Sequence, residues 1–265
     1  MTSTKKILVT GSNGQLGKCL QQLVQENPNP NYHYLFTDST LLNITNNAQV
    51  ESFFFANKFD YVVNCAAYTA VDKAETEIEQ AFKVNADAVG LLAKECNEQK
   101  AIFIHISTDY VFDGNKNTPY TVDDQTNPQS VYGKSKLEGE KLALKNNKKT
   151  IIIRTSWVYS EYGSNFVKTM KRLFKEKSEL NIVNDQFGKP TNALKLAEKI
   201  IQIILNPQQN FGIFHYASDK EQSWYDFAME IKSEEKSEIK LMPIPTSQYP
   251  TPAKRPQYSV LEVNI

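Results

Sequence analysis

The chain has 265 residues, enough for one large α/β domain or two closely packed lobes around a substantial core. Its 30 basic and 30 acidic residues give a formal net charge of zero, which leaves no electrostatic footprint for nucleic acid. No apolar run approaches the roughly 20 residues of a membrane span, and the cysteines are odd in number and widely spaced, so we expect a reduced, soluble, cytoplasmic protein.

Strand-like and helix-like segments alternate from residue 7 to residue 155, which predicts a parallel sheet with crossover helices. The fold expected for residues 1–156 is a Rossmann-like, doubly wound α/β domain that binds a dinucleotide. Its strands are predicted at residues 7–9, 34–36, 61–67, 102–106 and 151–153. Its helices are predicted at residues 16–28, 48–56, 74–92 and 132–146.

The alternation loosens after residue 156. Helices are expected near residues 166–176, 194–205 and 224–232, and the proline-rich stretch 242–256 is expected to be an irregular extended loop. We see no internal repeat and no low-complexity linker. Residues 157–265 are therefore predicted to form a smaller, mainly substrate-binding lobe, with some segments returning to the Rossmann sheet.

A glycine-rich segment, Gly11-Ser-Asn-Gly14-Gln-Leu-Gly17, directly follows the first strand and opens a helix. Glycines in this context allow a tight turn and a close approach of backbone to a pyrophosphate, and the helix N-terminus supplies oriented N–H groups. The segment predicts a dinucleotide site of the short-chain dehydrogenase type. A structural β–α turn is the alternative.

Asp38 closes the second predicted strand, where a carboxylate can bond an adenosine ribose hydroxyl and would repel a 2′-phosphate. The glycine loop and this strand end offer no Arg or Lys for such a phosphate. We therefore expect NADH or NADPH as the cofactor and favour NADH. A simple turn aspartate is the alternative for Asp38.

Two further strand ends carry small or polar residues. The third strand leads into Ala67, Tyr68 and Thr69, where small side chains would let the dinucleotide lie close to the sheet edge. The fourth ends in Ser107-Thr108-Asp109, where a hydroxyl can bond a substrate carbonyl and Asp109 can bind a sugar hydroxyl. Carboxyl ends of parallel strands meet at one edge, which predicts a common site.

Tyr132 and Lys136 lie four residues apart on a predicted amphipathic helix, so the phenol and the ammonium can face one cleft. A nearby cation lowers a tyrosine pKa, as suits a general acid that protonates a carbonyl oxygen while hydride arrives at carbon. Tyr216 and Lys220 have the same spacing, but they follow a β-like run and lack a helical pattern. The first pair predicts a nicotinamide-dependent carbonyl reductase.

The three histidines, His33, His105 and His215, are scattered and are expected to be core or edge residues. None has the spacing of a metal ligand or a nucleophile motif beside it, and the chain has no Gly-x-Ser-x-Gly. The residues therefore indicate neither metal chemistry nor hydrolysis.

With these motifs in place, the chain resembles the dTDP-4-dehydrorhamnose reductase family of extended short-chain dehydrogenases. The resemblance runs from Ile7 to about Leu261, and several independent motifs occur in the right order. They are residues 14–17, 64–72, 107–114, 132–140, 154–159, 185–191 and 255–259.

This resemblance implies reduction of the C4 ketone of dTDP-4-dehydro-L-rhamnose to dTDP-L-rhamnose. By position, Tyr132 is the proton donor, Lys136 tunes it and bonds the nicotinamide ribose, and Thr108 lowers the tyrosine pKa. The implied cofactor-binding residues are Gly11, Gly14, Gln15, Leu16, Asp38, Ala67, Tyr68, Thr69, Tyr132 and Lys136. The implied substrate-binding residues are Thr108, Asp109, Trp157, Asn165, Gln186 and Arg255, the last as a candidate for the diphosphate.

Some members of the family dimerise through Mg²⁺ held by glutamates, one of them just after the glycine motif. Cys19 occupies that position here, so no metal is transferred to this chain, while a homodimer remains compatible with the resemblance.

Two other functions stay open. One is a reductase of another 4-keto-6-deoxy nucleotide sugar, because stereochemistry depends on which sugar face meets the nicotinamide. The other is a non-catalytic, dinucleotide-binding regulatory subunit, as in the similar β-subunit of methionine adenosyltransferase. A sugar-nucleotide dehydratase is disfavoured, because it would need Asp-Glu after the threonine, and Asp109 is followed by Tyr110.

Overall fold

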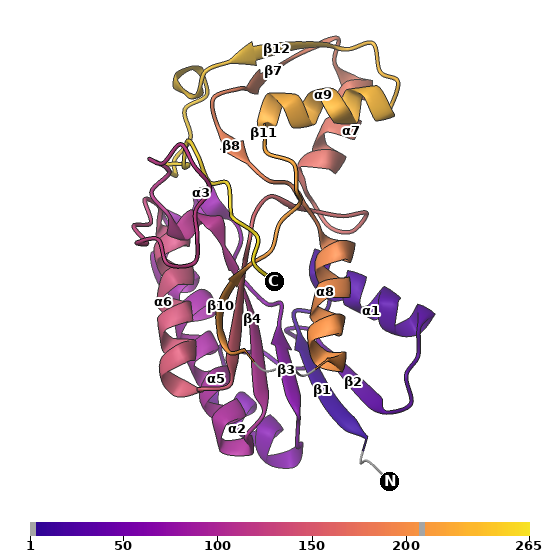
Figure 1. Ribbon diagram of the computed structural model, residues 1–265, viewed down its shortest axis with the longest axis vertical. Coiled ribbons are helices and arrows are strands. Elements are labelled where there is room, and N and C mark those ends of the chain that lie inside the picture. Colours follow the sequence, from indigo (N-terminus) through magenta and orange to yellow (C-terminus); the bar gives the residue numbers. More distant parts are fainter. Residues whose placement is uncertain (1–3, 207–209) are drawn as a thin grey trace.

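A central parallel sheet organises the protein, of which a computed structural model describes residues 4–206 and 210–265 (Figure 1). The sheet has six strands in the order β10-β5-β4-β3-β1-β2, and every neighbouring pair is parallel. The strands are β1 (Lys5–Thr10), β2 (Tyr32–Thr37), β3 (Tyr61–Asn64), β4 (Ile102–Thr108), β5 (Thr150–Thr155) and β10 (Gly212–His215). The predicted Rossmann-like sheet is confirmed.

The strand order reverses beside β1. The chain passes from β1 outward to β2 and then crosses back to β3 on the other side of β1. In a doubly wound sheet the crossovers on the two sides of such a point diverge and leave a crevice at the carboxyl ends of the strands. The topology therefore places a ligand crevice above β1 and β3.

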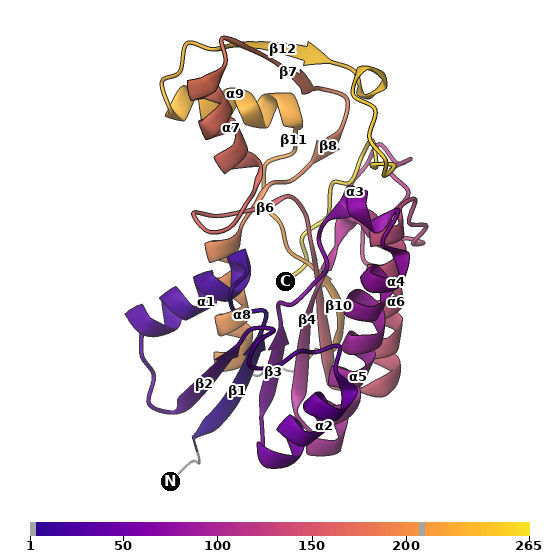
Figure 2. The ribbon, with the colours of Figure 1, turned by 180° about the vertical axis from the view of Figure 1, so that it is seen from behind.

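Helices cover both faces of the sheet (Figures 1 and 2). Along β1, Ile7 and Val9 pack in one core cluster and Leu8 in the other, because successive side chains point to opposite faces. One cluster includes α1 (Gln15–Glu26) and α8 (Ala193–Leu205). The other includes α2 (Asn47–Ala56), α5 (Ala88–Gln99) and α6 (Val131–Asn146).

The single helix predicted over residues 74–92 is correct only in part: residues 75–77 interrupt it, and the backbone is then helical without a gap from Ile78 to Gln99. The segment is divided into α3 (Val71–Ala74), α4 (Ile78–Phe82), the π-helical turn η1 (Lys83–Asp87) and α5. Polar side chains form hydrogen bonds at the interruption and in the π-helical turn. The Thr76 hydroxyl donates to the Lys73 carbonyl at 3.1 Å, and Asn85 in the π-helical turn bonds the backbone of a distant loop. Such turns commonly occur at functional sites.

The second lobe has its own small core. Helices α7 (Phe166–Glu176) and α9 (Trp224–Glu234) pack against the parallel pair β7 (Glu179–Val183) and β12 (Lys240–Ile244). The expectation of an irregular loop over 242–256 is wrong at its start, because β12 extends to Ile244. Pro243 is tolerated there because this two-stranded ribbon consists of edge strands. The shorter pairs are β8 (Phe187–Gly188) with β11 (Gln222–Ser223), and β6 (Val158–Tyr159) with β9 (Thr191–Asn192).

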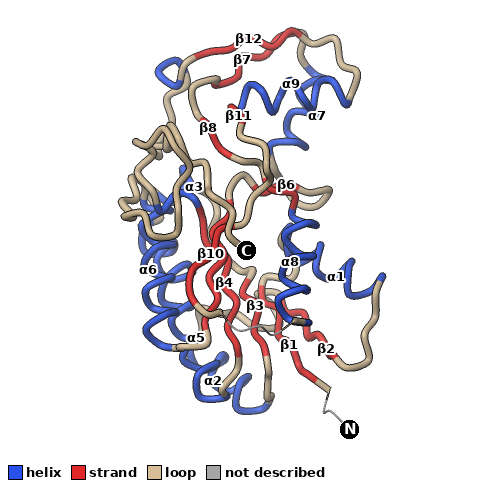
Figure 3. The backbone as a smooth tube through the Cα atoms, in the orientation of Figure 1, coloured by secondary structure: helices blue, strands red, loops and turns tan. Residues whose placement is uncertain are grey.

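Later segments return to the Rossmann sheet, as the tube view shows (Figure 3). After the second lobe begins, α8 packs beside α1 and β10 adds a strand next to β5. The last residues also come back, since Tyr120 N donates to the Val260 carbonyl at 2.8 Å and Asn264 N donates to the His215 carbonyl at 3.2 Å. Short 3-10 turns, η2 (Asp109–Val111) and η3 (Thr246–Gln248), complete the described elements. None of the helices in the described ranges has the length and apolar character to cross a membrane.

Candidate active site

A cleft of about 610 Å³ lies at the carboxyl edge of the sheet, beside the strand-order reversal. Its walls come from the starts of α1 and α6, the ends of β3, β4 and β5, and two segments of the second lobe. It is lined by ten of the predicted site residues: Gly14, Gln15, Leu16, Ala67, Thr69, Thr108, Asp109, Tyr132, Lys136 and Trp157.

Residues 14–16 of the glycine loop line the cleft, whereas Gly11, also predicted to bind the cofactor, lies against the segment after β3 and does not line it. Gly11 has φ +67°, and a Cβ on it would lie 2.5 Å from the backbone N of Ala66. A Cβ on Gly17 would lie 2.5 Å from the Gly11 carbonyl oxygen, so two strand ends and a helix start meet where only glycine fits. Among the described residues no side chain caps α1, whose N–H groups open on the cleft through Gly14 and Gln15. Uncapped N–H groups at a glycine-rich turn fit a pyrophosphate, so the site suits a dinucleotide.

Gly11→Ala is expected to destabilise the protein by about 1–3 kcal/mol, the cost of holding a non-glycine residue in such a conformation. Urea unfolding followed by circular dichroism measures the loss. Gly14→Ala is the matched control, because Gly14 has φ −75° and its nearest contact for a new Cβ is 3.3 Å away. Equal losses in the two variants would contradict the steric reading of Gly11.

Asp38 lies just after β2 and is engaged by its own turn. Its Oδ1 accepts from the Thr40 hydroxyl at 2.6 Å and from Leu41 N at 3.1 Å, while Oδ2 accepts from Asn13 Nδ2 at 2.7 Å. These bonds, the Thr40 hydroxyl first, lower the pKa of the Asp38 carboxyl. The carboxylate is thus held beside the glycine loop, although it does not line the cleft.

The loop after β3 is held by Asn85 of the π-helical turn. Asn85 Oδ1 accepts from Tyr68 N at 2.8 Å, and its Nδ2 donates to the Tyr68 carbonyl at 2.9 Å and to Ser135 Oγ of α6 at 3.0 Å. The Tyr68 phenol donates to Glu77 at 2.6 Å and does not line the cleft. Asn85 therefore fixes the backbone of Ala67 and Thr69 against α6, and the sequence alone gave no signal for this role.

Tyr132 lies in the first turn of α6. Ser130 caps that helix by accepting from Gly133 N at 3.2 Å, and a Cβ on Gly133 would lie 2.2 Å from the Tyr110 carbonyl, so the helix start packs tightly on η2. The Tyr132 ring makes an edge contact with Tyr110 at 5.6 Å. Burial raises the pKa of Tyr132 to about 12, and the Thr108 hydroxyl opposes that rise. The phenol therefore stays protonated through neutral pH.

Lys136 is buried one turn further along α6. Its Nζ donates to the Ile106 carbonyl at 2.6 Å and lies 3.3 Å from Nε2 of His105. Burial lowers the pKa of Lys136 to about 8, and the negative charge of Glu140 opposes that fall. In this position the amine faces β4, and the lowering of the tyrosine pKa by Lys136 stays a prediction.

The end of β4 supplies a second acidic group. Thr108 Oγ1 donates to Asp109 Oδ1 at 3.0 Å, while Asp109 Oδ2 has no hydrogen-bond partner among residues 4–206 and 210–265. Burial raises the pKa of Asp109 to about 6, so the group is mostly ionised at neutral pH. A buried acceptor without a partner in a cleft wall is suited to a sugar hydroxyl.

Trp157 brings the second lobe to the cleft. It has φ +49°, and its ring stacks on Trp224 with 3.5 Å between centroids. Gly188 lies against the same ring, since a Cβ there would be 2.5 Å from Trp157 Cε2. Trp224, at the start of α9, also lines the cleft and was not predicted. Trp224 is the first residue of α9, directly after the N-cap Ser223. The sequence did not show that this helix start packs against Trp157, which comes shortly after β5.

Three predicted substrate-binding residues lie outside the cleft lining. Asn165 caps α7 and donates from Nδ2 to Gln15 Oε1 at 2.8 Å. Gln186 is buried and donates to Thr246 Oγ1 at 3.0 Å. The Arg255 guanidinium pairs with both carboxylate oxygens of Asp72, at 3.0 and 2.8 Å. Each is thus committed to a protein partner in this structure.

The histidines occupy strand positions, as expected. His33 is exposed on β2, whereas His105 and His215 are fully buried on β4 and β10. The part of the chain that the structure describes holds no group of three His, Cys, Asp or Glu side chains able to bind a metal ion.

Comparison with known proteins gives consistent matches over nearly the whole chain. The family model described as RmlD substrate binding domain matches residues 5–265. The dTDP-4-dehydrorhamnose reductase of Aggregatibacter actinomycetemcomitans is 42% identical and aligns with 97% of this chain and 90% of its own. A solved dTDP-4-dehydrorhamnose reductase from Clostridium acetobutylicum has a TM-score of 0.93 at 44% identity, over 97% of this chain and 90% of that one. A second, from Bacillus anthracis in complex with NADP, has a TM-score of 0.93 at 37% identity, over 98% and 91%.

Proposed function

Because this chain belongs to the family described as RmlD substrate binding domain, we propose that it works as a dTDP-4-dehydrorhamnose reductase that uses NAD(P)H. It reduces the C4 ketone of dTDP-4-dehydro-L-rhamnose to the hydroxyl of dTDP-L-rhamnose. The observation that carries the proposal is the meeting of Thr108, Tyr132 and Lys136 in one cleft, beside a glycine loop that fits a dinucleotide.

Reduction of a ketone needs one hydride at carbon and one proton at oxygen. When bound, the reduced nicotinamide supplies the hydride. The Tyr132 phenol holds the proton, since its pKa of about 12 keeps it protonated at neutral pH. A general acid must lie within hydrogen-bond reach of the oxygen that it protonates, and the place of Tyr132 in the cleft lining supports this role.

The other cleft residues position the sugar. Thr108 and Asp109 lie at the end of β4, where the free Oδ2 of Asp109 accepts from a sugar hydroxyl in this proposal. The stacked rings of Trp157 and Trp224 form the apolar wall against which the sugar packs. Residues 157–265 then act mainly as the substrate-binding lobe. For Arg255 to bind the diphosphate, it would exchange part of its pairing with Asp72.

The reduced-nicotinamide absorbance band tests the proposal directly. Protein, dTDP-4-dehydro-L-rhamnose and either NADH or NADPH are mixed in parallel, and substrate-dependent loss of the band supports the reductase. A flat trace with cofactor still bound would overturn it for this sugar. In that case a panel of other 4-keto nucleotide sugars separates a different reductase from a regulatory protein.

We further propose that Asp38 favours NADH. Asp38→Ala should reduce the NADH-to-NADPH ratio of kcat/KM by about tenfold, the value of one hydrogen bond to a charged group. The ratio is measured from the same absorbance assay. Asp60→Ala is the matched control, because Asp60 is a surface carboxylate paired with Lys5, remote from the glycine loop. An unchanged ratio in Asp38→Ala would refute the ribose role, which the NADP complex of the Bacillus anthracis reductase makes worth measuring.

We also place the protein in the cytoplasm, because Cys19, Cys65 and Cys96 are free thiols and the proposed substrate is a nucleotide sugar. We also propose a homodimer, an oligomeric state that is compatible with the family resemblance. Sedimentation velocity at several protein concentrations distinguishes a dimer from a monomer.

A further inference from the structure

Four buried polar side chains form a continuous chain at the base of the cleft, from β1 through β3 and β4 to α6, and two of them, Asn64 and Lys136, line it. Thr10, Asn64, His105 and Lys136 are each between 0% and 2% exposed. Thr10 Oγ1 lies 2.6 Å from Asn64 Oδ1, Asn64 Nδ2 lies 3.0 Å from His105 Nδ1, and His105 Nε2 lies 3.3 Å from Lys136 Nζ. From the sequence, His105 was expected to be a core or edge residue, and its contact with Lys136 was not predicted.

The orientation of the Asn64 amide is fixed by a backbone donor. Ala66 N donates to the Asn64 oxygen at 3.2 Å, and a backbone N–H cannot accept a hydrogen bond. The flipped amide would place its NH₂ group against this N–H, leaving two donors facing each other. Asn64 therefore presents its NH₂ group to His105, and Nδ1 of His105 must accept.

The tautomer of His105 follows from that contact. Burial lowers the pKa of His105 well below its usual range, so the ring is neutral and carries one proton. Because Nδ1 accepts, the proton is on Nε2, which faces Lys136 Nζ. A lysine ammonium has three donors and no lone pair, whereas a neutral amine has a lone pair that can accept. The amine still donates to the Ile106 carbonyl at 2.6 Å.

We infer that Asn64 and His105 are positioning residues that hold an N–H group against Lys136 and favour its neutral amine while it rests against β4. When the amine turns toward the cleft it leaves this N–H group and takes up one proton from solvent. The effect on turnover rests on the proposed role of Lys136, whereas the tautomer and the state of the resting amine do not.

Some groups around Lys136 favour its ammonium form and others favour its neutral amine. Glu140, one turn further along α6, favours the ammonium, whereas burial raises the pKa of Cys65 to about 12 and leaves a neutral thiol after β3. Glu140 is already paired with Arg154 of β5 at 2.7 Å, and Tyr132 on α6 is a protonated, neutral phenol at neutral pH. Burial opposes the charge, and the His105 N–H group acts in the same direction as burial.

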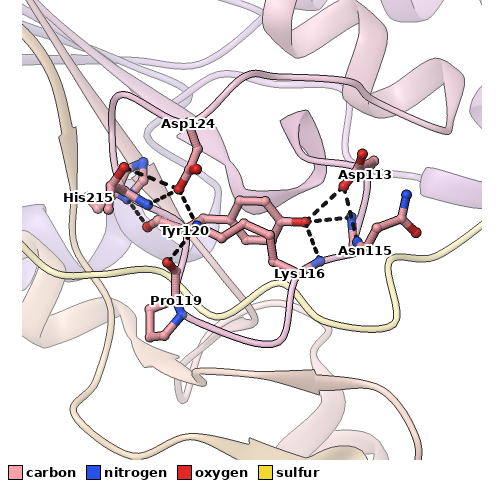
Figure 4. A network of polar contacts seen from close by, with 9 residues as sticks. Asp113, Asn115, Lys116, Pro119, Tyr120, Asp124 and His215 are labelled. Atoms are coloured by element: carbon pink, nitrogen blue, oxygen red, sulfur yellow. Dashed lines mark hydrogen bonds and ion pairs between the residues drawn. The ribbon is translucent and has the colours of Figure 1, made fainter.

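The first test is the tautomer itself, read from long-range ¹H–¹⁵N correlation spectra of the uniformly ¹⁵N-labelled full chain without ligand. His105, assigned by its loss in His105→Gln, should show a protonated Nε2 and an unprotonated Nδ1. His215 is an internal reference of opposite type, because its Nδ1 donates to the Tyr120 carbonyl at 3.1 Å (Figure 4). A protonated Nδ1 at His105 would overturn the inference.

The second test reverses the tautomer of His105. In Asn64→Asp the carboxylate still accepts from Ala66 N and Thr10, and it offers a further acceptor to His105 Nδ1. The tautomer should switch, Nε2 should accept from a Lys136 ammonium, and the alkaline limb of the kcat/KM profile should move up by about 1 pH unit or more. Asn46→Asp makes the same chemical change at the N-cap of α2 and should leave the profile unmoved.

If the tautomer of His105 switches but the pKa of Lys136 does not change, the inference that the His105 N–H group favours the neutral amine is overturned. If Asn64→Asp does not fold, the ¹³Cε resonance of Lys136 in the wild-type chain, assigned by its loss in Lys136→Arg, decides the question. The titration midpoint of this resonance is compared with that in His105→Phe, which keeps an aromatic ring and removes the N–H group. A higher midpoint in the variant supports the inference, whereas equal midpoints, or an ordinary midpoint in the wild-type chain, overturn it. These readouts stand even if dTDP-4-dehydro-L-rhamnose is not reduced, so failure of the proposed function is distinguishable.

Discussion

Tyr132→Phe is expected to lower kcat by about 10²–10⁴-fold, the contribution of a positioned general acid. The substitution removes one hydroxyl and leaves the ring, so the edge contact with Tyr110 and the packing of α6 should persist. Cofactor affinity should therefore stay close to that of the wild-type protein. The measurements are kcat and KM from the reduced-nicotinamide band, and cofactor binding from quenching of tryptophan fluorescence, to which the stacked Trp157 and Trp224 contribute.

The chain supplies its own control in Tyr216→Phe. Tyr216 has a lysine four residues later, as Tyr132 does, but its hydroxyl donates to the Lys195 carbonyl at 3.2 Å at the surface. This variant should keep full turnover. If Tyr132→Phe retained turnover within a few-fold of the wild type, Tyr132 would not be the proton donor, whereas loss of cofactor binding would indicate a structural defect instead.

A buried ion pair joins α6, the helix that carries Tyr132 and Lys136, to the sheet. Glu140 of α6 and Arg154 of β5 have side chains only 1% and 2% exposed. Arg154 donates from Nε to Glu140 Oε1 at 2.9 Å and from a terminal nitrogen to Oε2 at 2.7 Å. Ser107 Oγ also donates to Oε1, at 2.5 Å, so the end of β4 next to Thr108 joins the same network.

Glu140→Gln should lower the free energy of unfolding by about 3–5 kcal/mol, because it leaves the Arg154 charge buried without a counter-ion. Arg154 has no second carboxylate that the structure pairs with it, and its other terminal nitrogen already lacks a hydrogen-bond partner among the described residues. Urea unfolding monitored by circular dichroism measures the loss. Replacing both residues with apolar ones of similar size should recover much of it, since desolvation offsets most of the attraction in a buried pair.

The matched control is Glu176→Gln in the pair between Arg172 and Glu176, at 2.6 Å. Their side chains are 59% and 47% exposed, so solvent screens the pair and the expected loss is below about 1 kcal/mol. Similar losses in Glu140→Gln and Glu176→Gln would show that burial does not set the value of the first pair. Because Glu140 also bonds Ser107, Glu140→Gln should reduce turnover more than a surface variant does.

The sequence determined the features that depend on neighbouring residues. Continuous apolar runs such as Ile7-Leu-Val9 predicted strands buried on both faces, and the sheet has them, because a strand places alternate side chains on opposite sides. The glycine segment from Gly11 to Gly17 predicted a strand–turn–helix unit, which the positive φ of Gly11 and its close approach to Ala66 explain. The sequence also favoured Tyr132 over Tyr216 as the candidate general acid, because the residues that follow Tyr132 have the periodicity of an amphipathic helix and those around Tyr216 do not.

The tertiary structure alone decided contacts between residues far apart in the chain. The neighbour of Lys136 is His105, 31 residues earlier, and only the packing of α6 on β4 brings them together. Arg255 pairs with Asp72 across 183 residues, which no spacing rule predicts. The sequence thus determined which chemistry the chain carries, because side-chain type and local period are written along it. Strand order, register and helix packing decided which groups form hydrogen bonds and ion pairs with one another, because those contacts exist only once the sheet has formed.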